Sequence, residues 1–571
     1  MEGPSSGDGG GPGGQQQLPS RIHGGLGLRG SMAGGGAVGP LRSALLPAPP
    51  LRPPLLLPLL PLSPLNNNNL TLCCSPLHIL SDARAFSSAS SDVDAFIGCL
   101  STTIPCNLVK TPGTNSYSKL LMSSVQNLRA VLPGTTRPVV IIAATDPAHV
   151  QATVVCGRRH SVRIRTRSGG HDYEGLSYAS IHPREHFAVL DLAELRAIHI
   201  NPTRSEAWVE SGATIGELYY AVASGNQTFG FLAGNCPTLG VGGHLSGGGL
   251  SRKYGLSADN VLDAVVVDAE GRLLNRSTMG EDLFWAIRGG GGESFGVVVS
   301  WKVRFVPVPE IVTVLSISRS RNQSAIDLIT RWQLVAPVPP RDLYLRVVVQ
   351  NQQAAFFALF LGQCGRLVDT MRRYFPELGM TQQDCQEMRK GTQPDWLARV
   401  ALGLLVEVVG HHVRKVMPRQ AWESIWDKWL EKPEAASVML DPYGALMGTI
   451  SESETPFPHR SYLHQIQLFS SWFENGTETL EKRLGWLRGV YEDLTPYVSN
   501  NPRAVFVNYR DLDLGTNELE GNVTSYEKAR VWGEKYFKGN FERLAAVKSK
   551  VDPEDFFRNE QSIPPLPAAI G

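Results

Sequence analysis

The sequence lacks an excess of charge of either sign. Its 54 basic and 53 acidic residues leave a net charge of +1, and charged residues make up only 19% of the 571 positions. This balance gives no electrostatic footprint for nucleic acid or for a strongly acidic partner. The hydrophobic fraction of 42% excludes a chain that is disordered throughout. We therefore expect a globular protein and, at this length, at least two domains.

Long uninterrupted hydrophobic runs are also missing. The leucine-rich stretch at residues 45–65 is broken by prolines, so we expect no membrane span. Residues 1–91 add glycine-rich and asparagine-rich stretches to this run, and we interpret them as a low-complexity leader that is disordered or removed. The leader resembles a targeting sequence. Translation from Met32 and a mis-assigned first exon stay open as alternatives.

Cysteine is sparse, with eight residues in the chain, two of them in the leader. The other six exclude a disulfide-rich scaffold but are compatible with one or two disulfides. Six Asn-x-Ser/Thr sequons, more than we expect by chance, favour the secretory pathway. We expect an extracellular or cell-wall location, with organelle targeting as the alternative. The sequons begin at Asn69, Asn226, Asn275, Asn322, Asn475 and Asn522.

Patterns of strands and helices begin after the leader. Residues 138–167 are typical of a strand, a helix with Asp146 as its N-cap, and a second strand. Thr214 and Glu217 have the spacing of a capping box, which predicts a helix there. From residue 311 to about residue 500, strand and helix patterns mix. Three further elements are predicted: a helix over 116–132, a strand and turn over 504–515, and a helix over 526–551.

The first chemical motif is a strand that runs into a paired glycine turn, Arg165-Thr-Arg-Ser-Gly-Gly-His171. Paired glycines let successive backbone N–H groups converge on an anion, and pyrophosphate is the natural ligand. No helix pattern follows at once, which excludes the GxGxxG fingerprint of a doubly wound domain. The His171 side chain can face such a ligand. The alternative is a histidine that only hydrogen-bonds its own loop.

Two more glycine-rich motifs follow. In residues 234–249, seven of the sixteen positions are glycine. Ordering this segment costs much backbone entropy, so we expect it to wrap closely around a large ligand, with a flexible linker as the alternative. Taken alone, Cys236 fits a buried thiol or a disulfide partner. Residues 282–299 join an aromatic helix to a four-glycine turn and a buried strand. Three such loops together indicate a large cofactor.

These three motifs and the segment 501–515 make residues 92–567 resemble the plant berberine bridge enzyme-like proteins. That family belongs to the vanillyl-alcohol-oxidase/p-cresol-methylhydroxylase flavoprotein superfamily. The resemblance implies an α+β fold, with a two-part FAD-binding domain of the p-cresol-methylhydroxylase type and a substrate domain built on an antiparallel sheet with helices. The expected bounds are 92–310 for the FAD-binding domain (core 134–310), 311–500 for the substrate domain and 501–567 for a C-terminal segment that returns to the FAD-binding domain.

The resemblance also implies how the cofactor is held. Relatives bond the flavin 8α-methyl to the histidine of the RSGGHD motif, here His171, and flavin C6 to the cysteine of the CPT motif, here Cys236. We therefore predict covalent FAD at both residues, since imidazole and thiolate are the nucleophiles able to add to an electron-poor flavin. No metal site is predicted. The implied disulfides are Cys99–Cys156 and, as a second one, Cys364–Cys385. The implied cofactor-binding residues are Arg167, Ser168, Gly169, Gly170, His171, Asp172, Ser177, Cys236, Thr238, Gly240, Gly242, Gly243, His244, Gly247, Gly248, Val297, Asn508 and Tyr509.

For the reaction, we expect oxidation of an alcohol on a small-molecule substrate, either a phenolic allylic alcohol or a carbohydrate. The family implies Tyr509 and Gln467 as catalytic residues, with Tyr509 as the base. A free tyrosine titrates near ~10, so a base near neutrality needs positive charge nearby. Relatives place a lysine two residues before the glutamine, where this chain has Gln465. The tyrosine that relatives carry between the GGG and RKYG motifs is missing, because only Leu250-Ser251 lies there.

Three further expectations concern turnover. Leu239 follows the CPT motif, where the family controls oxygen access, and its bulk favours a dehydrogenase over an oxidase. One alternative is a flavin-binding secreted glycoprotein with impaired catalysis, in which Tyr509 only hydrogen-bonds the flavin. Another is an alkaloid-type ring-forming oxidase, which is disfavoured because residues 461–472 contain no acid to act as its base. His464 is expected on the opposite strand face from Gln465. No oligomeric state is predicted.

Overall fold

The computed structural model describes residues 87–567 apart from 184, 226–227, 235, 250–251, 390–404 and 473–475. All described residues lie in the unit Thr71–Gly571. Residues 1–86 of the predicted leader, three sequons (Asn69, Asn226 and Asn475) and the Leu250-Ser251 link lie outside the described residues. The last residues of the predicted leader, 87–91, belong to a helix, α1 (Ser87–Leu100). Among the helices that are described, none has the length and apolarity of a membrane span.

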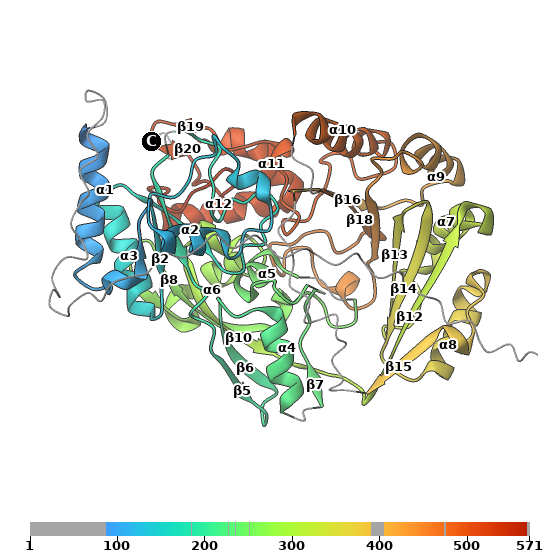
Figure 1. The fold of residues 1–571 in the computed structure, drawn as a ribbon. Coiled ribbons are helices and arrows are strands. Elements are labelled where there is room, and N and C mark those ends of the chain that lie inside the picture. Colours follow the sequence, from blue (N-terminus) through green and yellow to red (C-terminus); the bar gives the residue numbers. More distant parts are fainter. Residues whose placement is uncertain are drawn as a thin grey trace, which may run out of the picture. The chain divides into compact units, whose positions relative to one another are not determined.

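The N-terminal part of the fold contains a small sheet with the strand order β1-β2-β4-β3, in which β2, β4 and β3 run parallel. The predicted strand, helix and strand over 138–167 are confirmed, and Asp146 caps the helix by accepting from Ala148 N at 2.8 Å. The helices α1 and α3 pack side by side (Figure 1) and are joined by the predicted Cys99–Cys156 disulfide. The elements are α1 (Ser87–Leu100), β1 (Val109–Lys110), α2 (Asn115–Met122), β2 (Val140–Ala143), α3 (Pro147–Arg159), β3 (Arg163–Arg167) and β4 (Phe187–Asp191).

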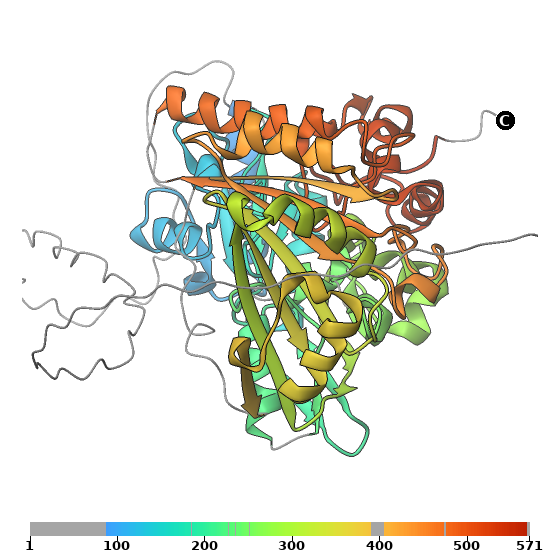
Figure 2. The same ribbon diagram turned by 90° about the vertical axis from the view of Figure 1, so that its right-hand side faces the viewer.

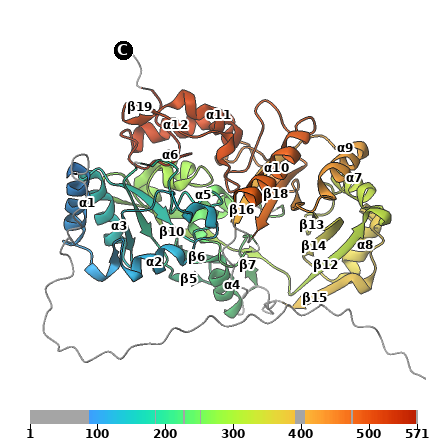
Figure 3. The ribbon, with the colours of Figure 1, turned by 45° about the horizontal axis from the view of Figure 1, so that its top comes forward.

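A second, antiparallel sheet has the order β5-β6-β10-β8-β9. The predicted capping box is confirmed: Thr214 Oγ1 accepts from Glu217 N, and the Glu217 carboxylate accepts from Thr214 N at 2.9 Å. The C-terminal helices α11 and α12 share the hydrophobic core of this sheet, and α12 packs against α6 (Figure 3). The elements are β5 (Ile198–Asn201), β6 (Glu206–Glu210), α4 (Ile215–Ser224), β7 (Phe229–Gly230), α5 (Val241–Gly247), β8 (Val261–Val267), β9 (Leu273–Leu274), α6 (Arg276–Ile287), β10 (Val297–Arg304), β11 (Val306–Pro307), α11 (Tyr526–Phe537) and α12 (Asn540–Val551).

The largest sheet is antiparallel, with the order β15-β12-β14-β13-β17-β18-β16. Four helices cover one of its faces and form a common core with the inward-pointing strand residues (Figure 2). The predicted Cys364–Cys385 disulfide ties β15 to α8. The elements are β12 (Ile311–Ser320), α7 (Ala325–Val335), β13 (Leu343–Gln350), β14 (Gln353–Phe360), α8 (Cys364–Tyr374), β15 (Cys385–Arg389), β16 (Leu405–Val413), α9 (Arg419–Ile425), β17 (Ser437–Pro442), β18 (His464–Trp472) and α10 (Thr477–Asp493).

The predicted α+β class with a large antiparallel sheet is confirmed. The domain bounds at 310 and 500 stay predictions, because residues 71–571 form one compact unit. Three local predictions were wrong. The helix over 116–132 ends at Met122, since the Asn127 side chain accepts from Arg129 N and starts a separate turn. The helix over 526–551 breaks at Lys538, where φ is 47°. Residues 504–515 contain the predicted turn but no strand, because none of the strands that the structure describes pairs with them.

Candidate active site

A cavity of about 1890 Å³ separates the glycine-rich loops from the uncovered face of the largest sheet. Typical small-molecule pockets measure ~300–1,000 Å³, so this cavity has room for a dinucleotide together with a substrate. Its loop wall comes from residues 168–177 and 231–249, and its sheet wall comes from β13, β17 and β18. Residues 506–510 close the space between the two walls. The site is therefore assembled from segments that are far apart in the sequence.

The two main glycine motifs meet backbone to backbone. A Cβ added to Gly169 would lie 2.3 Å from Gly240 N, and a Cβ on Gly240 would lie 2.3 Å from Gly169 N and 2.1 Å from Ser168 Oγ. No side chain fits at such distances, so both positions require glycine. Gly170 adds a left-handed φ of 68° directly before His171. The contact fixes the two loops in one relative position.

This contact brings the two predicted flavin anchors to a single hydroxyl group. His171 Nε2 lies 2.8 Å from Thr238 Oγ1, and Cys236 Sγ lies 3.5 Å from the same oxygen. The hydrogen bond of His171 therefore crosses to the second loop instead of closing its own loop, and Cys236 takes part in no disulfide. Burial lowers the pKa of His171 to about 4, so its imidazole is neutral near neutral pH and keeps a nucleophilic nitrogen lone pair.

The loop wall also fits a large polar ligand. The Ser177 hydroxyl is buried on the cavity wall, and the described residues supply it with no hydrogen-bond partner. A Cβ on Gly243 would meet nothing within 4 Å and would project into open space at the cavity wall. A buried hydroxyl without a partner is costly unless a bound molecule or water satisfies it. Both observations are consistent with a cofactor lying along this wall.

The helix α5 inside the second glycine motif was not predicted. Glycine is a poor helix former, so its frequency in residues 234–249 masked the helix. Val241 and Leu245 are one helical turn apart and fully buried, and this spacing is the signal that could have revealed it. His244 lines the cavity, but its Nε2 lies 2.9 Å from Ser257 Oγ, and burial lowers its pKa to about 4.

Most of the predicted cofactor-binding residues reach the cavity. Those on its wall are Ser168, Gly169, Gly170, His171, Asp172, Ser177, Cys236, Gly240, Gly242, Gly243, His244, Gly247, Asn508 and Tyr509. Thr238 contacts both predicted anchors and Gly248 caps the C-terminal end of α5, but neither residue lines the cavity.

Two predicted residues differ from the expectation. The Arg167 guanidinium is fully buried, donates to Asp191 Oδ2 at 2.5 Å, and donates to the Leu120 and Leu121 carbonyl oxygens. The Val297 side chain is fully buried in the core shared with the small sheet. Only the backbone atoms of these two residues remain candidates for ligand contact, because their side chains serve the fold.

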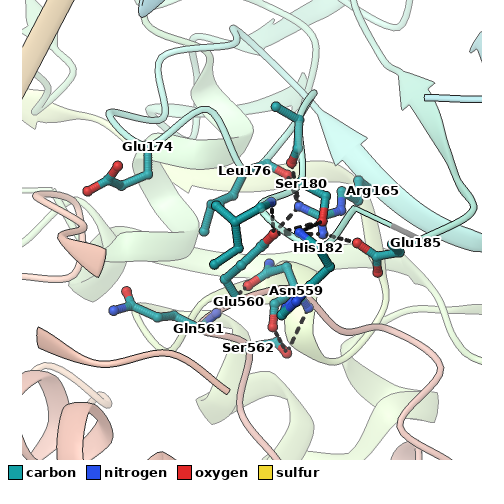
Figure 4. Close-up of polar contacts among 12 residues, drawn as sticks. Arg165, Glu174, Leu176, Ser180, His182, Glu185, Asn559, Glu560, Gln561 and Ser562 are labelled. Atoms are coloured by element: carbon teal, nitrogen blue, oxygen red, sulfur yellow. Dashed lines mark hydrogen bonds and ion pairs between the residues drawn. The ribbon is translucent and has the colours of Figure 1, made fainter. Parts of the chain in front are cut away.

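The first loop is braced from behind by the C-terminal segment (Figure 4). Arg165 on β3 donates to both carboxylate oxygens of Glu560, at 2.8 and 3.1 Å, and to Glu185. The same guanidinium donates to the Leu176 and Ala179 carbonyl oxygens, just after the His171 turn. Burial alone would raise the pKa of Glu560, but Arg165 holds it below its usual value, so the carboxylate stays charged. The Arg165–Glu560 pair therefore fixes the backbone at Leu176 and Ala179, just after the first glycine loop.

Both predicted catalytic residues line the cavity, and Tyr173 is near both of them. Gln467 Nε2 lies 3.5 Å from the hydroxyl of Tyr173, whose ring centroid is 6.2 Å from that of Tyr509. Tyr509 follows Asn508, whose Oδ1 accepts from Gly249 N and whose Nδ2 donates to the Gly243 carbonyl. These bonds tie the residue before Tyr509 to α5 and to the turn after it, and Tyr509 lines the same cavity as the two predicted anchors.

Sequence reasoning missed three residues of the sheet wall: Tyr344, Arg346 and Asp441. Arg346 Nε and Nη2 donate to the two oxygens of Asp441, at 2.5 and 2.9 Å, and the Tyr344 hydroxyl donates to the same carboxylate. The alternation in β13 could have placed Tyr344 and Arg346 on one face. The pairing of β13 with β17, which brings in Asp441, depends on a register that the sequence does not display.

His464 lies on the opposite face of β18, as predicted. Its Nε2 lies 3.4 Å from Gln333 Oε1, and its ring meets Trp332 edge-on. It therefore cannot supply the charge that Gln465 lacks. The residues of β18 contain no acid, but Asp441 stands directly opposite Gln465 on β17. The absence of an acid from residues 461–472 therefore did not mean that this part of the site lacks a carboxylate.

Comparison with known proteins gives consistent matches. Residues 138–277 match the FAD binding domain family, and residues 505–564 match the family described as berberine and berberine like. The chain is 51% identical over 488 residues to the berberine bridge enzyme-like protein Cyn d 4 of Cynodon dactylon, with 82% of this chain and 93% of the relative covered. It is 43% identical over 479 residues to the monolignol oxidoreductase AtBBE-like 13 of Arabidopsis thaliana, with 79% and 88% covered.

A solved structure is similar over the same region. Phl p 4, described as a grass pollen allergen with glucose dehydrogenase activity, is 47% identical and superposes with a TM-score of 0.80. The match covers 83% of this chain and all of the other.

Gly240→Ala tests whether the contact between the two loops governs the site. Because the new Cβ would collide with Ser168 and Gly169, we expect a loss of about 1–3 kcal/mol in the free energy of unfolding and a lower flavin content after purification. Urea unfolding and flavin absorbance measure the two effects. Gly485→Ala in α10 is the control, since its Cβ meets nothing within 4 Å and should leave both values unchanged or slightly raise stability. A Gly240→Ala protein with the parent's stability and flavin content would contradict the interpretation.

Proposed function

Because the chain belongs to the plant berberine bridge enzyme-like family of FAD-linked oxidoreductases, we propose that it holds FAD through His171 and Cys236 and oxidises a hydroxyl group of a carbohydrate. The observation that carries the proposal is the position of both anchors on the Thr238 hydroxyl, in the cavity that Tyr509 also lines. A neutral imidazole and a thiol that share one hydroxyl lie close enough together to reach one flavin ring system. This arrangement favours two bonds to the same flavin.

The sheet wall supports a substrate rich in hydroxyl groups. Its polar side chains, Gln350, Ser437, Gln467 and Ser471, offer hydrogen-bond donors and acceptors between apolar residues such as Val348 and Met439. A phenolic alcohol would leave many of these groups without partners, which is costly in an enclosed site. The similarity to a protein described as a glucose dehydrogenase supports the same choice. A phenolic allylic alcohol remains the second candidate, because AtBBE-like 13 is described as a monolignol oxidoreductase.

In this proposal Tyr509 accepts the hydroxyl proton of the substrate. Bound FAD supplies a hydride acceptor at N5. Tyr173 lies beside Tyr509, and Gln467 hydrogen-bonds to Tyr173, so in this proposal the two residues orient the hydroxyl group. Burial raises the pKa of Tyr509 above its usual value, and the nearby Asp441 raises it further. Only the phenolate can accept a proton, so the rate of substrate oxidation should increase with pH into the alkaline range.

Two alternatives receive different support. Because its pKa is raised, Tyr509 is protonated near neutral pH, and turnover there should be slow. Slow turnover supports the first alternative, a flavin-binding glycoprotein with impaired catalysis. An alkaloid-type ring-forming oxidase would need a free carboxylate base. Asp441 is the acid nearest to Gln465 on the sheet wall, but its oxygens are occupied by Arg346, Tyr344 and Gln465. We therefore rank the ring-forming oxidase last.

A secreted location is part of the proposal. The two disulfides, Cys99–Cys156 and Cys364–Cys385, are typical of an oxidising compartment. The three sequon asparagines that the structure describes, Asn275, Asn322 and Asn522, are all exposed, as glycan acceptors must be.

Leu239 favours a dehydrogenase in the proposed reaction. Its side chain lines the cavity, and its N–H donates to the Cys236 carbonyl, so it sits next to one anchor. A bulky aliphatic side chain there restricts the space in which oxygen could reach the flavin. A variant of Phl p 4 with valine in place of one isoleucine is described as a glucose oxidase, which supports control by a single aliphatic residue in that relative.

Anaerobic addition of alcohols to the purified protein tests the proposed reaction. We expect glucose and short oligosaccharides to bleach the oxidised flavin absorbance, faster at alkaline pH, and a monolignol to act more slowly. Tyr509→Phe should slow the bleaching by about 10²–10⁴-fold without loss of flavin. Tyr220→Phe, at a tyrosine 66% exposed on α4, is the matched control and should keep the parent rate. A flavin that no alcohol reduces at any pH would support the non-catalytic alternative.

Reoxidation by air tests the role of Leu239. Stopped-flow absorbance of the reduced protein should show slow reoxidation in the parent and faster reoxidation in Leu239→Val, because the smaller side chain opens space beside the flavin. Leu239→Ile, which conserves the volume, should behave like the parent. Rapid reoxidation of the parent itself would overturn the assignment as a dehydrogenase.

A further inference from the structure

A buried ion pair between Asp441 and Arg346 is linked through Gln465 to Tyr509, the proposed base. We propose that the Asp441–Arg346 pair, acting through Gln465, keeps Tyr509 protonated and so confines substrate oxidation to alkaline pH. Asp441 is a positioning residue in this account, since it acts on Tyr509 and need not touch the substrate. The inference rests on the proposed function, in which Tyr509 accepts the substrate's proton.

The strand register places the three side chains in one row. Asp441 pairs directly with Gln465 across β17 and β18. The pairing of Val347 with Leu440 puts Arg346 next to Asp441 across β13 and β17. Residues paired in this way point to the same face of the sheet, and this face lines the cavity. The row is therefore fixed by backbone pairing rather than by mobile side chains.

The hydrogen bonds of Gln465 have one consistent orientation. Gln465 Nε2 lies 3.2 Å from Asp441 Oδ2 and 3.3 Å from the Tyr509 hydroxyl, while Gln465 Oε1 accepts from the Tyr443 hydroxyl at 3.0 Å. The opposite amide orientation would set Oε1 against the Asp441 carboxylate. The two amide hydrogens therefore go to Asp441 and Tyr509. Gln465 supplies a hydrogen bond to a phenolate but no charge.

The charge of Arg346 is largely balanced by Asp441. The guanidinium and the carboxylate form a two-point contact, and the carboxylate is fully buried, so water does not screen it. The carboxylate and the Tyr509 hydroxyl both lie within 3.3 Å of one nitrogen. That places them within the ~4–6 Å range over which one charge shifts the pKa of another group. Burial first, then Asp441 and Tyr173, raise the pKa of Tyr509, whereas Arg346 and Gln465 lower it by less.

The other titratable groups around Asp441 carry little charge near neutral pH. Burial raises the pKa of Tyr344 and Tyr443 well above their usual values, so both stay neutral. Burial lowers the pKa of His412 to about 3 and that of His464 to about 4, so both histidines are neutral as well.

One more cation, Arg252, lies next to this part of the sheet and lines the same cavity. Burial lowers the pKa of Arg252 to about 10, and its guanidinium donates to the carbonyl oxygens of Tyr443, Leu343 and Pro337. Arg252 thus donates to backbone oxygens, whereas Gln465 links the Asp441–Arg346 pair to Tyr509. We therefore assign the effect on the pKa of Tyr509 to the Asp441–Arg346 pair.

Replacing the Asp441 carboxylate by an amide of the same shape should lower the pKa of Tyr509 and so increase the fraction of phenolate. In Asp441→Asn, Arg346 loses its counter-charge and stabilises the Tyr509 phenolate. We expect the pKa of Tyr509 to fall by about one to three. If the phenolate fraction limits the rate, flavin reduction near neutral pH should accelerate about tenfold or more. A loss of charge at the site would thus raise activity, the opposite of what loss of a catalytic residue does.

The test measures Tyr509 with and without substrate. Ultraviolet difference absorbance follows phenolate formation in the substrate-free holoprotein, and subtraction of the matching Tyr509→Phe proteins isolates the signal of Tyr509. Stopped-flow measurement of anaerobic flavin reduction by glucose across the same pH range gives the kinetic profile. The matched control is Asp259→Asn, which removes a carboxylate from another largely buried pair, that with Arg460. It should leave the Tyr509 titration in place.

The outcomes are distinct. A lower pKa of Tyr509 in Asp441→Asn, with the kinetic profile moved by the same amount, supports the proposal. An unchanged or higher pKa overturns it. If glucose and other alcohols never reduce the flavin but the Tyr509 titration still moves, the proposed function fails while the influence of Asp441 stands.

If Asp441→Asn does not fold, Asp441→Asn with Arg346→Gln removes both charges, and the pKa of Tyr509 should then fall by a smaller amount. No fall in that variant would also overturn the proposal.

Discussion

The site depends on a contact between two glycines. Gly169 and Gly240 approach so closely that neither could carry a Cβ, and this approach places His171 and Cys236 on the same hydroxyl group. The rest of the loop wall is braced around the contact, by Arg165 and Glu560 behind the first loop and by α5 inside the second. The cost of ordering so many glycines is compensated by packing that only glycine permits. The glycine motifs therefore bring together the two residues that we propose to bond the flavin.

The opposite wall of the cavity follows a different rule. Strand register, rather than close backbone approach, sets Arg346, Asp441 and Gln465 side by side. The loop wall fits a bound cofactor. In our proposal, the sheet wall sets the pKa of the base beside that cofactor. The proposed base lies where the two walls meet, so both influence it. We therefore expect substitutions in the sheet wall to change the rate of turnover while cofactor attachment persists.

The sequence predicted what depends on local chemistry. Glycine turns, the capping box at Thr214 and both disulfides appear where the motifs and the resemblance placed them. It did not predict α5, because the low helix propensity of glycine concealed a buried Val241–Leu245 pair. Asp441 was missed because the pairing of distant strands carries no local signal. Arg167 lies in a motif for the cofactor, yet its side chain serves the fold through Asp191, and only the three-dimensional arrangement distinguishes the two roles.

The central claim is that one FAD is bonded to both anchors, and intact mass after acid denaturation tests it most directly. The parent protein should keep the mass and absorbance of one flavin, as should His171→Ala and Cys236→Ala, each through the remaining bond. The double variant should release all of its flavin into the acid supernatant. Flavin released by acid from the parent, or retained by the double variant, would contradict the account.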